Sequence, residues 1–139
     1  HRLDRELIFD SGAYSINNVI LPNNVFNHSD VWAKGQTVHE LTHVWDFRQT
    51  PLFYLSDEMN RKTKSFGFIC DGYWDITCPY KNDPVGENEP PPTIYAKTNN
   101  PREDLAESVA IFLYPTFKNA GANLGSIRKA YIQQAMASP

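Results

Sequence analysis

The sequence predicts an α+β fold in which a small antiparallel sheet at the N-terminus precedes a long first helix, a second helix and a C-terminal helix. Two observations support this prediction. Short apolar or alternating runs separated by turn residues fill the chain up to Pro22, a pattern typical of a β-meander. Further along, apolar residues recur at steps of three and four, as they do on one face of a helix. Residues 1–139 are expected to form one domain, because this length suits a single core.

The expected strands of the sheet are residues 7–9, 13–16 and 19–21. The segments between them, residues 10–12 and 17–18, are rich in Asp, Ser, Gly and Asn, which favour tight turns. A sheet is therefore expected before the first helix.

The first helix is expected to begin at Ser29 or Asp30, either of which can cap it, and to end at residues 49–51, Gln-Thr-Pro. Small or apolar residues at steps of four and three form one stripe that would face the core: Val31, Gly35, Val38, Thr42 and Trp45.

The middle of this helix carries the pentapeptide His-Glu-Leu-Thr-His at residues 39–43. The imidazoles of His39 and His43, four positions apart, project from one face and can bind one Zn²⁺, while Glu40 lies beside them. The pattern predicts a zinc-dependent endopeptidase in which Glu40 is the general base that activates a zinc-bound water. The alternative is that these are ordinary polar side chains on a half-buried helix.

A catalytic zinc needs a third protein ligand and an open position for water. The metzincin pattern is excluded, because Asp46 and Gln49 occupy the positions where that class carries Gly and a third His. A second helix is expected from Pro101, with Asn100 as its cap and Pro115 as its end. Its carboxylates at Glu103 and Glu107, four apart, share one face.

The pentapeptide and the sequence Glu-Asp-Leu-Ala-Glu at residues 103–107 together resemble the gluzincins, HExxH peptidases whose third zinc ligand is a glutamate on a second helix. The match is to small bacterial and toxin-type members. The resemblance implies that Glu103 is the third zinc ligand, that Glu107 hydrogen-bonds His39, and that Tyr95 stabilises the oxyanion.

Other assignments of the third ligand remain open on the residues themselves. Glu103 also fits a capping box, which would leave Glu107 as the ligand. Further alternatives are Asp71, Asp75 and Asp104.

The resemblance also implies a zincin-like arrangement, with the sheet over the active-site helix. Residues 18–21 would then either form the rim of a substrate cleft by pairing with an extended peptide or only cover the core. A helical turn near residues 55–62 and a last helix at about residues 124–136 are expected as packing elements.

Composition excludes several classes of partner. A net charge of −3 is too small to indicate binding to nucleic acid or to a membrane, and no apolar run reaches transmembrane length. Cys70 and Cys78 are expected to form a disulfide, which would suggest a secreted or exported protein. Two free thiols are nearly as compatible with the sequence, and a zinc clip is less so.

Two other functions share the same residues. One is a zinc-stabilised binding or delivery module without catalysis, which Glu40 argues against because a structural site needs no base. The other is an effector protease of narrow specificity. The expected partner is a protein or peptide substrate, and the sequence does not indicate an oligomeric state.

Overall fold

The computed structural model describes residues 2–3, 21–48, 54–65 and 88–137. Helices account for 77% of these residues. The α-helices are α1 Asp30–Arg48, α2 Leu55–Thr63, α3 Ile94–Thr98, α4 Pro101–Leu113 and α5 Ser126–Ala137. Short 3₁₀ turns lie at η1 Asn23–Asn27, η2 Phe117–Asn119 and η3 Gly121–Asn123.

The predicted α+β fold is wrong, because the described part of the chain is all-helical. Its only strand pairing joins β1 Arg2–Leu3 to β2 Leu21–Pro22 in parallel, over two residues. The predicted strands at residues 7–9 and 13–16 lie outside the described residues. Of the third predicted strand, residues 19–21, only Leu21 is described. Within the described residues the partner of α1 is helix α4 rather than an antiparallel sheet.

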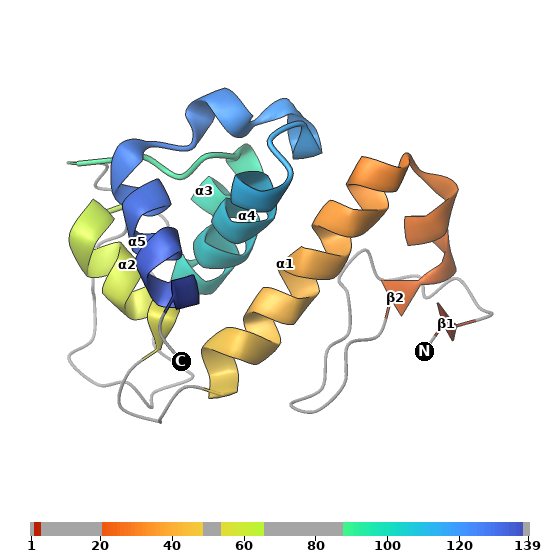
Figure 1. Cartoon of the computed structure of the whole chain (residues 1–139), viewed down its shortest axis with the longest axis horizontal. Helices are drawn as coiled ribbons and strands as arrows, with labels where there is room; N and C mark the ends of the chain where they lie inside the picture. The colour runs from red at the N-terminus through yellow and green to blue at the C-terminus, as the bar shows by residue number, and fades with distance from the viewer. Residues whose placement is uncertain (1, 4–20, 49–53, 66–87, 138–139) are drawn as a thin grey trace.

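Helix α1 is the longest described element and runs diagonally between the N-terminal strands and the other helices (Figure 1). It begins as predicted, because the Ser29 hydroxyl accepts a hydrogen bond from the backbone N–H of Trp32 at 3.3 Å. The predicted apolar stripe is not its most buried face, since Val38 is half-buried whereas His39 and His43 are 3% and 6% exposed. Four residues of the pentapeptide are therefore buried, and Leu41 is exposed.

Helix α4 is the central element of the fold. The predicted cap is present, because the Asn100 side chain accepts hydrogen bonds from the N–H groups of Arg102 and Glu103. One core cluster joins α4 to α2 and α5 and consists of Met59, Leu105, Val109, Tyr131 and Ile132. A second joins it to the turns that follow and consists of Ala110, Ile111, Phe117, Ala120 and Leu124. Burial on several sides holds α4 in one position beside α1.

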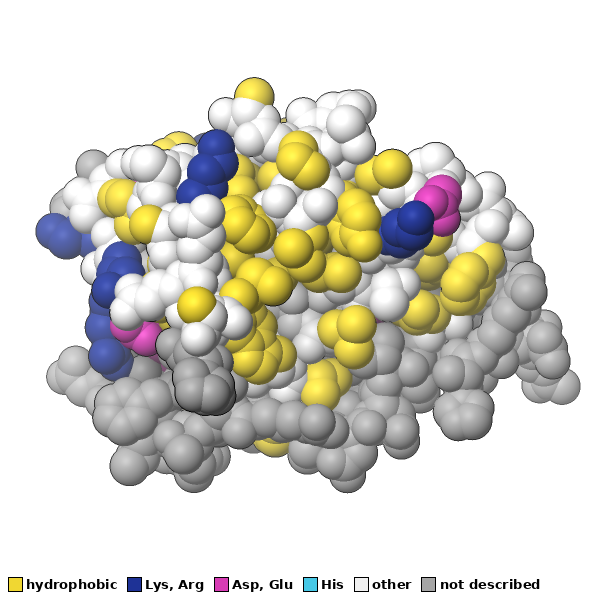
Figure 2. All heavy atoms as spheres, in the orientation of Figure 1, with side chains coloured by type: hydrophobic (Ala, Val, Ile, Leu, Met, Phe, Trp, Pro, Cys, Tyr) yellow, Lys and Arg dark blue, Asp and Glu magenta, His cyan; other side chains and the backbone are white. Residues whose placement is uncertain are grey.

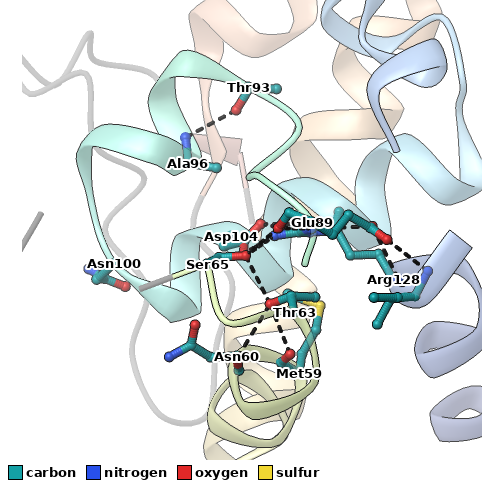
Figure 3. A network of polar contacts seen from close by, with 12 residues as sticks. Met59, Asn60, Thr63, Ser65, Glu89, Thr93, Ala96, Asn100, Asp104 and Arg128 are labelled. Atoms are coloured by element: carbon teal, nitrogen blue, oxygen red, sulfur yellow. Dashed lines mark hydrogen bonds and ion pairs between the residues drawn. The ribbon is translucent and has the colours of Figure 1, made fainter. Parts of the chain in front are cut away.

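A buried polar network joins α4 to α5 and to the segments that carry Ser65 and Glu89 (Figure 3). The guanidinium of Arg128, fully buried on α5, donates to Asp104 on α4 at 2.7 Å and to Ser65 at 2.6 Å. It also donates to the backbone carbonyl of Glu89 at 2.9 Å, while the Glu89 carboxylate accepts from the first N–H groups of α5. These bonds satisfy the buried charges and join α4, α5 and the segments beside them.

The surface in Figure 2 carries hydrophobic side chains across its middle, with a few charged groups toward its edges. None of the described helices is both long and apolar enough to cross a membrane.

Candidate metal centre

The predicted site residues of the two helices meet where α1 packs against α4. His39 and His43, one helical turn apart, face α4. Glu103 and Glu107, one turn apart on α4, face α1 in return. The structure therefore brings together the four side chains that the sequence placed in two separate motifs.

Three donor atoms converge to a near-regular triangle. The distances are 3.0 Å from His39 Nε2 to Glu103 Oε2, 3.3 Å from His43 Nε2 to the same oxygen, and 3.1 Å between the two Nε2 atoms. In a tetrahedral site with bonds of about 2.0–2.1 Å, neighbouring ligand atoms lie about 3.3–3.4 Å apart. The triangle is thus close to the size that a small divalent cation requires, and a cluster of these three residues could hold a metal ion.

The Glu103 oxygen favours a shared cation, although the two histidine Nε2 atoms lie within hydrogen-bond distance of each other. Glu103 Oε2 is buried and accepts no well-aligned hydrogen bond, although two ring nitrogens lie within 3.3 Å of it. Buried polar atoms in proteins are almost always satisfied. An ion bound between the three atoms would satisfy the Glu103 oxygen.

Glu107 lies behind His39, on the side away from the triangle. Its Oε1 is 3.1 Å from His39 Nδ1, close but poorly aligned for a hydrogen bond. The carboxylate is fully buried and accepts from Thr93 Oγ1 at 2.9 Å and from Lys118 Nζ at 2.7 Å. A proton on Nδ1 facing this carboxylate would leave Nε2 with its lone pair toward the triangle.

The electrostatics of the cluster favour a bound cation. Burial alone would lower the pKa of His39, but the neighbouring carboxylates of Glu103 and Glu107 raise that pKa to about 9. Burial would raise the pKa of Glu103, yet the two histidines lower it well below its usual range. The two carboxylates thus stabilise a positive charge at His39, and a metal ion that replaced the proton there would receive the same stabilisation.

Glu40 is buried beside the ligands, with 3% of its surface exposed. Burial raises the pKa of Glu40, while the nearby His39 and His43 act in the opposite direction. Gln36, one turn earlier on α1, donates from Nε2 to Glu40 Oε1 at 3.0 Å. A carboxylate with a raised pKa next to a metal cluster has the properties of a proton acceptor and donor.

Tyr95 lies at the solvent side of the cluster, on the short helix α3. Its ring centroid is 6.1 Å from that of His39, and its hydroxyl interacts with the Glu103 carboxylate. Burial and that carboxylate raise the pKa of Tyr95, so the hydroxyl keeps its proton. Tyr95 is 43% exposed and the Glu103 side chain 18%, although the Glu103 Oε2 atom itself is buried.

The other candidates for the third ligand are not in this cluster as far as the structure describes them. Asp104 is bound to Arg128 in the buried network. Asp71 and Asp75 lie outside the described residues, as do Cys70 and Cys78.

Sequence reasoning missed three side chains that contact the site. Gln36 lies four residues before Glu40, a helical spacing that could have revealed it. Thr93 and Lys118 reach Glu107 from other segments, and no local pattern connects them with it.

No protein-family model matches the chain, and comparison with the curated proteins and with the solved structures found no match. The resemblance to gluzincins therefore rests on the two motifs alone and remains a prediction.

Proposed function

We propose that the protein is a zinc-dependent endopeptidase in which His39, His43 and Glu103 bind the metal. A bound zinc ion would supply Lewis acidity, which lowers the pKa of a water molecule to about 7 and polarises a peptide carbonyl. Imidazole and carboxylate ligands in a tetrahedral arrangement are a donor set typical of catalytic zinc.

In this proposal Glu40 is the general base and acid. It accepts a proton as water attacks the peptide carbonyl and then delivers that proton to the leaving amine. Gln36 holds one carboxylate oxygen of Glu40 by a hydrogen bond. The Tyr95 hydroxyl, which stays protonated, donates to the oxygen of the substrate carbonyl as negative charge develops there.

The observation that carries this proposal is the triangle of three donor atoms with a buried glutamate beside it. A metal site that only stabilises a fold has four protein ligands and needs no proton acceptor next to it. Among the described residues, three candidate ligands and a buried Glu40 occur together, beside the partly exposed Tyr95. This combination supports the proposal of a hydrolytic centre over that of a closed structural site.

The test is zinc analysis of the purified chain together with cleavage of an unfolded protein substrate, with and without a chelator. Glu40→Gln is expected to keep one zinc per chain and to lose about 10²–10⁴-fold in kcat, the usual contribution of a general base. His39→Ala is expected to lose the metal. Asp30→Asn is the matched control, because Asp30 is an exposed carboxylate on the same helix.

The outcomes separate the proposed peptidase from its alternatives. Full activity in Glu40→Gln would contradict the assignment of the base. One zinc per chain without cleavage of any broad substrate would favour a non-catalytic module or an effector that cleaves a single protein. A chain that binds no zinc would contradict the metal site itself.

A further inference from the structure

The Glu107 carboxylate is held by side chains from three different segments. His39 Nδ1 approaches Oε1 from α1, Lys118 Nζ donates to the same oxygen from η2, and Thr93 Oγ1 donates to Oε2 from the start of α3. A fully buried carboxylate with one such contact could still rotate, whereas donors on both oxygens fix its plane. The orientation of the carboxylate toward His39 therefore depends on Thr93 and Lys118.

Thr93 has two roles at once. Its hydroxyl donates a hydrogen bond to Glu107 at 2.9 Å. The same hydroxyl accepts a hydrogen bond from the N–H of Ala96 at 3.0 Å, and this second bond caps α3 (Figure 3). Tyr95 lies on this short helix. The cap thus ties the segment that carries Tyr95 to the carboxylate behind the metal ligand His39.

Lys118 occupies its place at a conformational cost. It has φ 51°, and the next residue, Asn119, has φ 52°, a left-handed region that a lysine rarely adopts and an asparagine tolerates. Phe117, fully buried, fixes the turn by packing on α1 at Gly35. Strained residues that the surrounding structure enforces are concentrated at functional sites.

The Lys118 ammonium also lies 4.9 Å from the centre of the Tyr95 ring. A cation over an aromatic face is attracted by the ring, and the interaction strengthens with burial. Lys118 therefore contacts both Glu107 and the side chain proposed to stabilise the oxyanion.

We propose that Thr93 and Lys118 are positioning residues that hold the Glu107 carboxylate against His39 and so set the affinity of the metal site. This inference rests on the proposed function, because it assumes that His39 binds zinc. The two residues act through Glu107 and touch neither metal nor substrate.

The test compares paired variants by zinc affinity, measured by competition with a chromophoric chelator, and by the visible absorption of the Co²⁺-loaded protein. Thr93→Val and Lys118→Met are each expected to weaken zinc binding about tenfold, at the lower end of the 10- to 100-fold range for partners of metal ligands. They are also expected to shift the Co²⁺ absorption band. Thr93→Ser and Lys118→Arg, which keep a hydrogen-bond donor, are expected to retain the wild-type zinc affinity and the wild-type Co²⁺ absorption band. Lys97→Met removes an exposed lysine from α3 and is the control.

A double-mutant cycle separates positioning through Glu107 from a general loss of structure. In a Glu107→Gln background, Thr93→Val and Lys118→Met are expected to cause no further loss of zinc affinity. Undiminished losses in that background, or unchanged zinc affinity and Co²⁺ absorption in the single variants, would overturn the inference.

Peptide cleavage is measured separately from zinc binding. Weaker zinc binding in the variants of a chain that cleaves no peptide would support the inference and contradict the peptidase. A wild-type chain that binds no zinc would overturn both.

Discussion

The two glutamates of α4 have different surroundings, and this difference favours one of them as a ligand of the proposed metal site. Glu103 presents an oxygen to both Nε2 atoms and accepts no aligned hydrogen bond there. Glu107 already accepts from Thr93 and Lys118. An ion would satisfy Glu103, whereas Glu107 is satisfied without one. The geometry therefore favours Glu103 as the ligand and Glu107 as the partner of His39.

This assignment predicts unequal effects of two matched substitutions. Glu107→Gln is expected to weaken zinc binding about 10- to 100-fold, because it disturbs a partner of a ligand. Glu103→Gln is expected to lose more, because it removes a ligand atom. Chelator competition at constant pH measures both, and Glu58→Gln, an exposed carboxylate on α2, is the control. Zinc loss with Glu107→Gln but not with Glu103→Gln would reverse the assignment.

How much of the site the sequence could predict depends on the range of each contact. The His39–His43 pair is readable because a helix brings positions four apart onto one face. Glu103 was placed by resemblance to a known second motif, and no spacing links it to His39 across 64 residues. Lys118 was missed because its contact with Glu107 depends on a strained turn, which no composition signal marks.

At the scale of elements, helix ends were predictable and the sheet was not. Ser29 and Asn100 both accept hydrogen bonds from the first N–H groups of their helices, because caps are encoded within a few residues. A strand needs a partner elsewhere in the chain, so short apolar runs alone do not establish one. The parallel pairing of β2 with residues 2–3 shows that even its direction could not be read locally.

Gly35 allows α1 to contact the turn that carries Lys118. A Cβ atom at this position would lie 2.2 Å from the Phe117 ring, which is fully buried and cannot move aside. Gly35→Ala is therefore expected to destabilise the protein by about 1–3 kcal/mol, the usual effect of overpacking, despite the higher helix propensity of Ala. Urea denaturation measures the effect.

A second variant tests the cause. Phe117→Leu in the Gly35→Ala background is expected to recover part of the loss, because the smaller side chain makes room for the added methyl group. If the two substitutions are simply additive, the contact between Gly35 and Phe117 is not the reason for the glycine.

At the scale of the whole molecule, the Arg128 network holds together the half of the fold that supports α4. Arg128→Met is expected to destabilise the protein by about 3–5 kcal/mol, because it leaves Asp104 buried without its cation and Glu89 with fewer donors. The measurement is the free energy of unfolding in urea. Lys129→Met, the exposed neighbour on α5, is expected to change it by less than about 0.5 kcal/mol. Equal effects of the two variants would show that the network contributes little to stability.

Stability of the metal-free protein and its response to zinc are expected to change with pH in opposite directions. The pKa of His39 is raised from 6.5 to about 9 by Glu103 and Glu107 despite burial. Protonated His39 therefore stabilises the metal-free fold, by on the order of 3 kcal/mol. This contribution is fully present below about pH 6.5 and is lost as the pH rises through about 9. Zinc binds only the deprotonated imidazole and must displace that proton.

The melting temperature of the chelator-treated protein is thus expected to fall between pH 6.5 and 9, while the increase caused by zinc grows over the same range. Thermal unfolding at both pH values, with chelator and with excess zinc, measures the two trends. Both trends are expected to disappear in His39→Ala. His28→Ala, which removes an exposed histidine just before α1, is expected to retain them. A zinc-induced increase of the same size at pH 6.5 and pH 9 would mean that zinc does not compete with a proton on His39, and the ligand assignment at that position would fail.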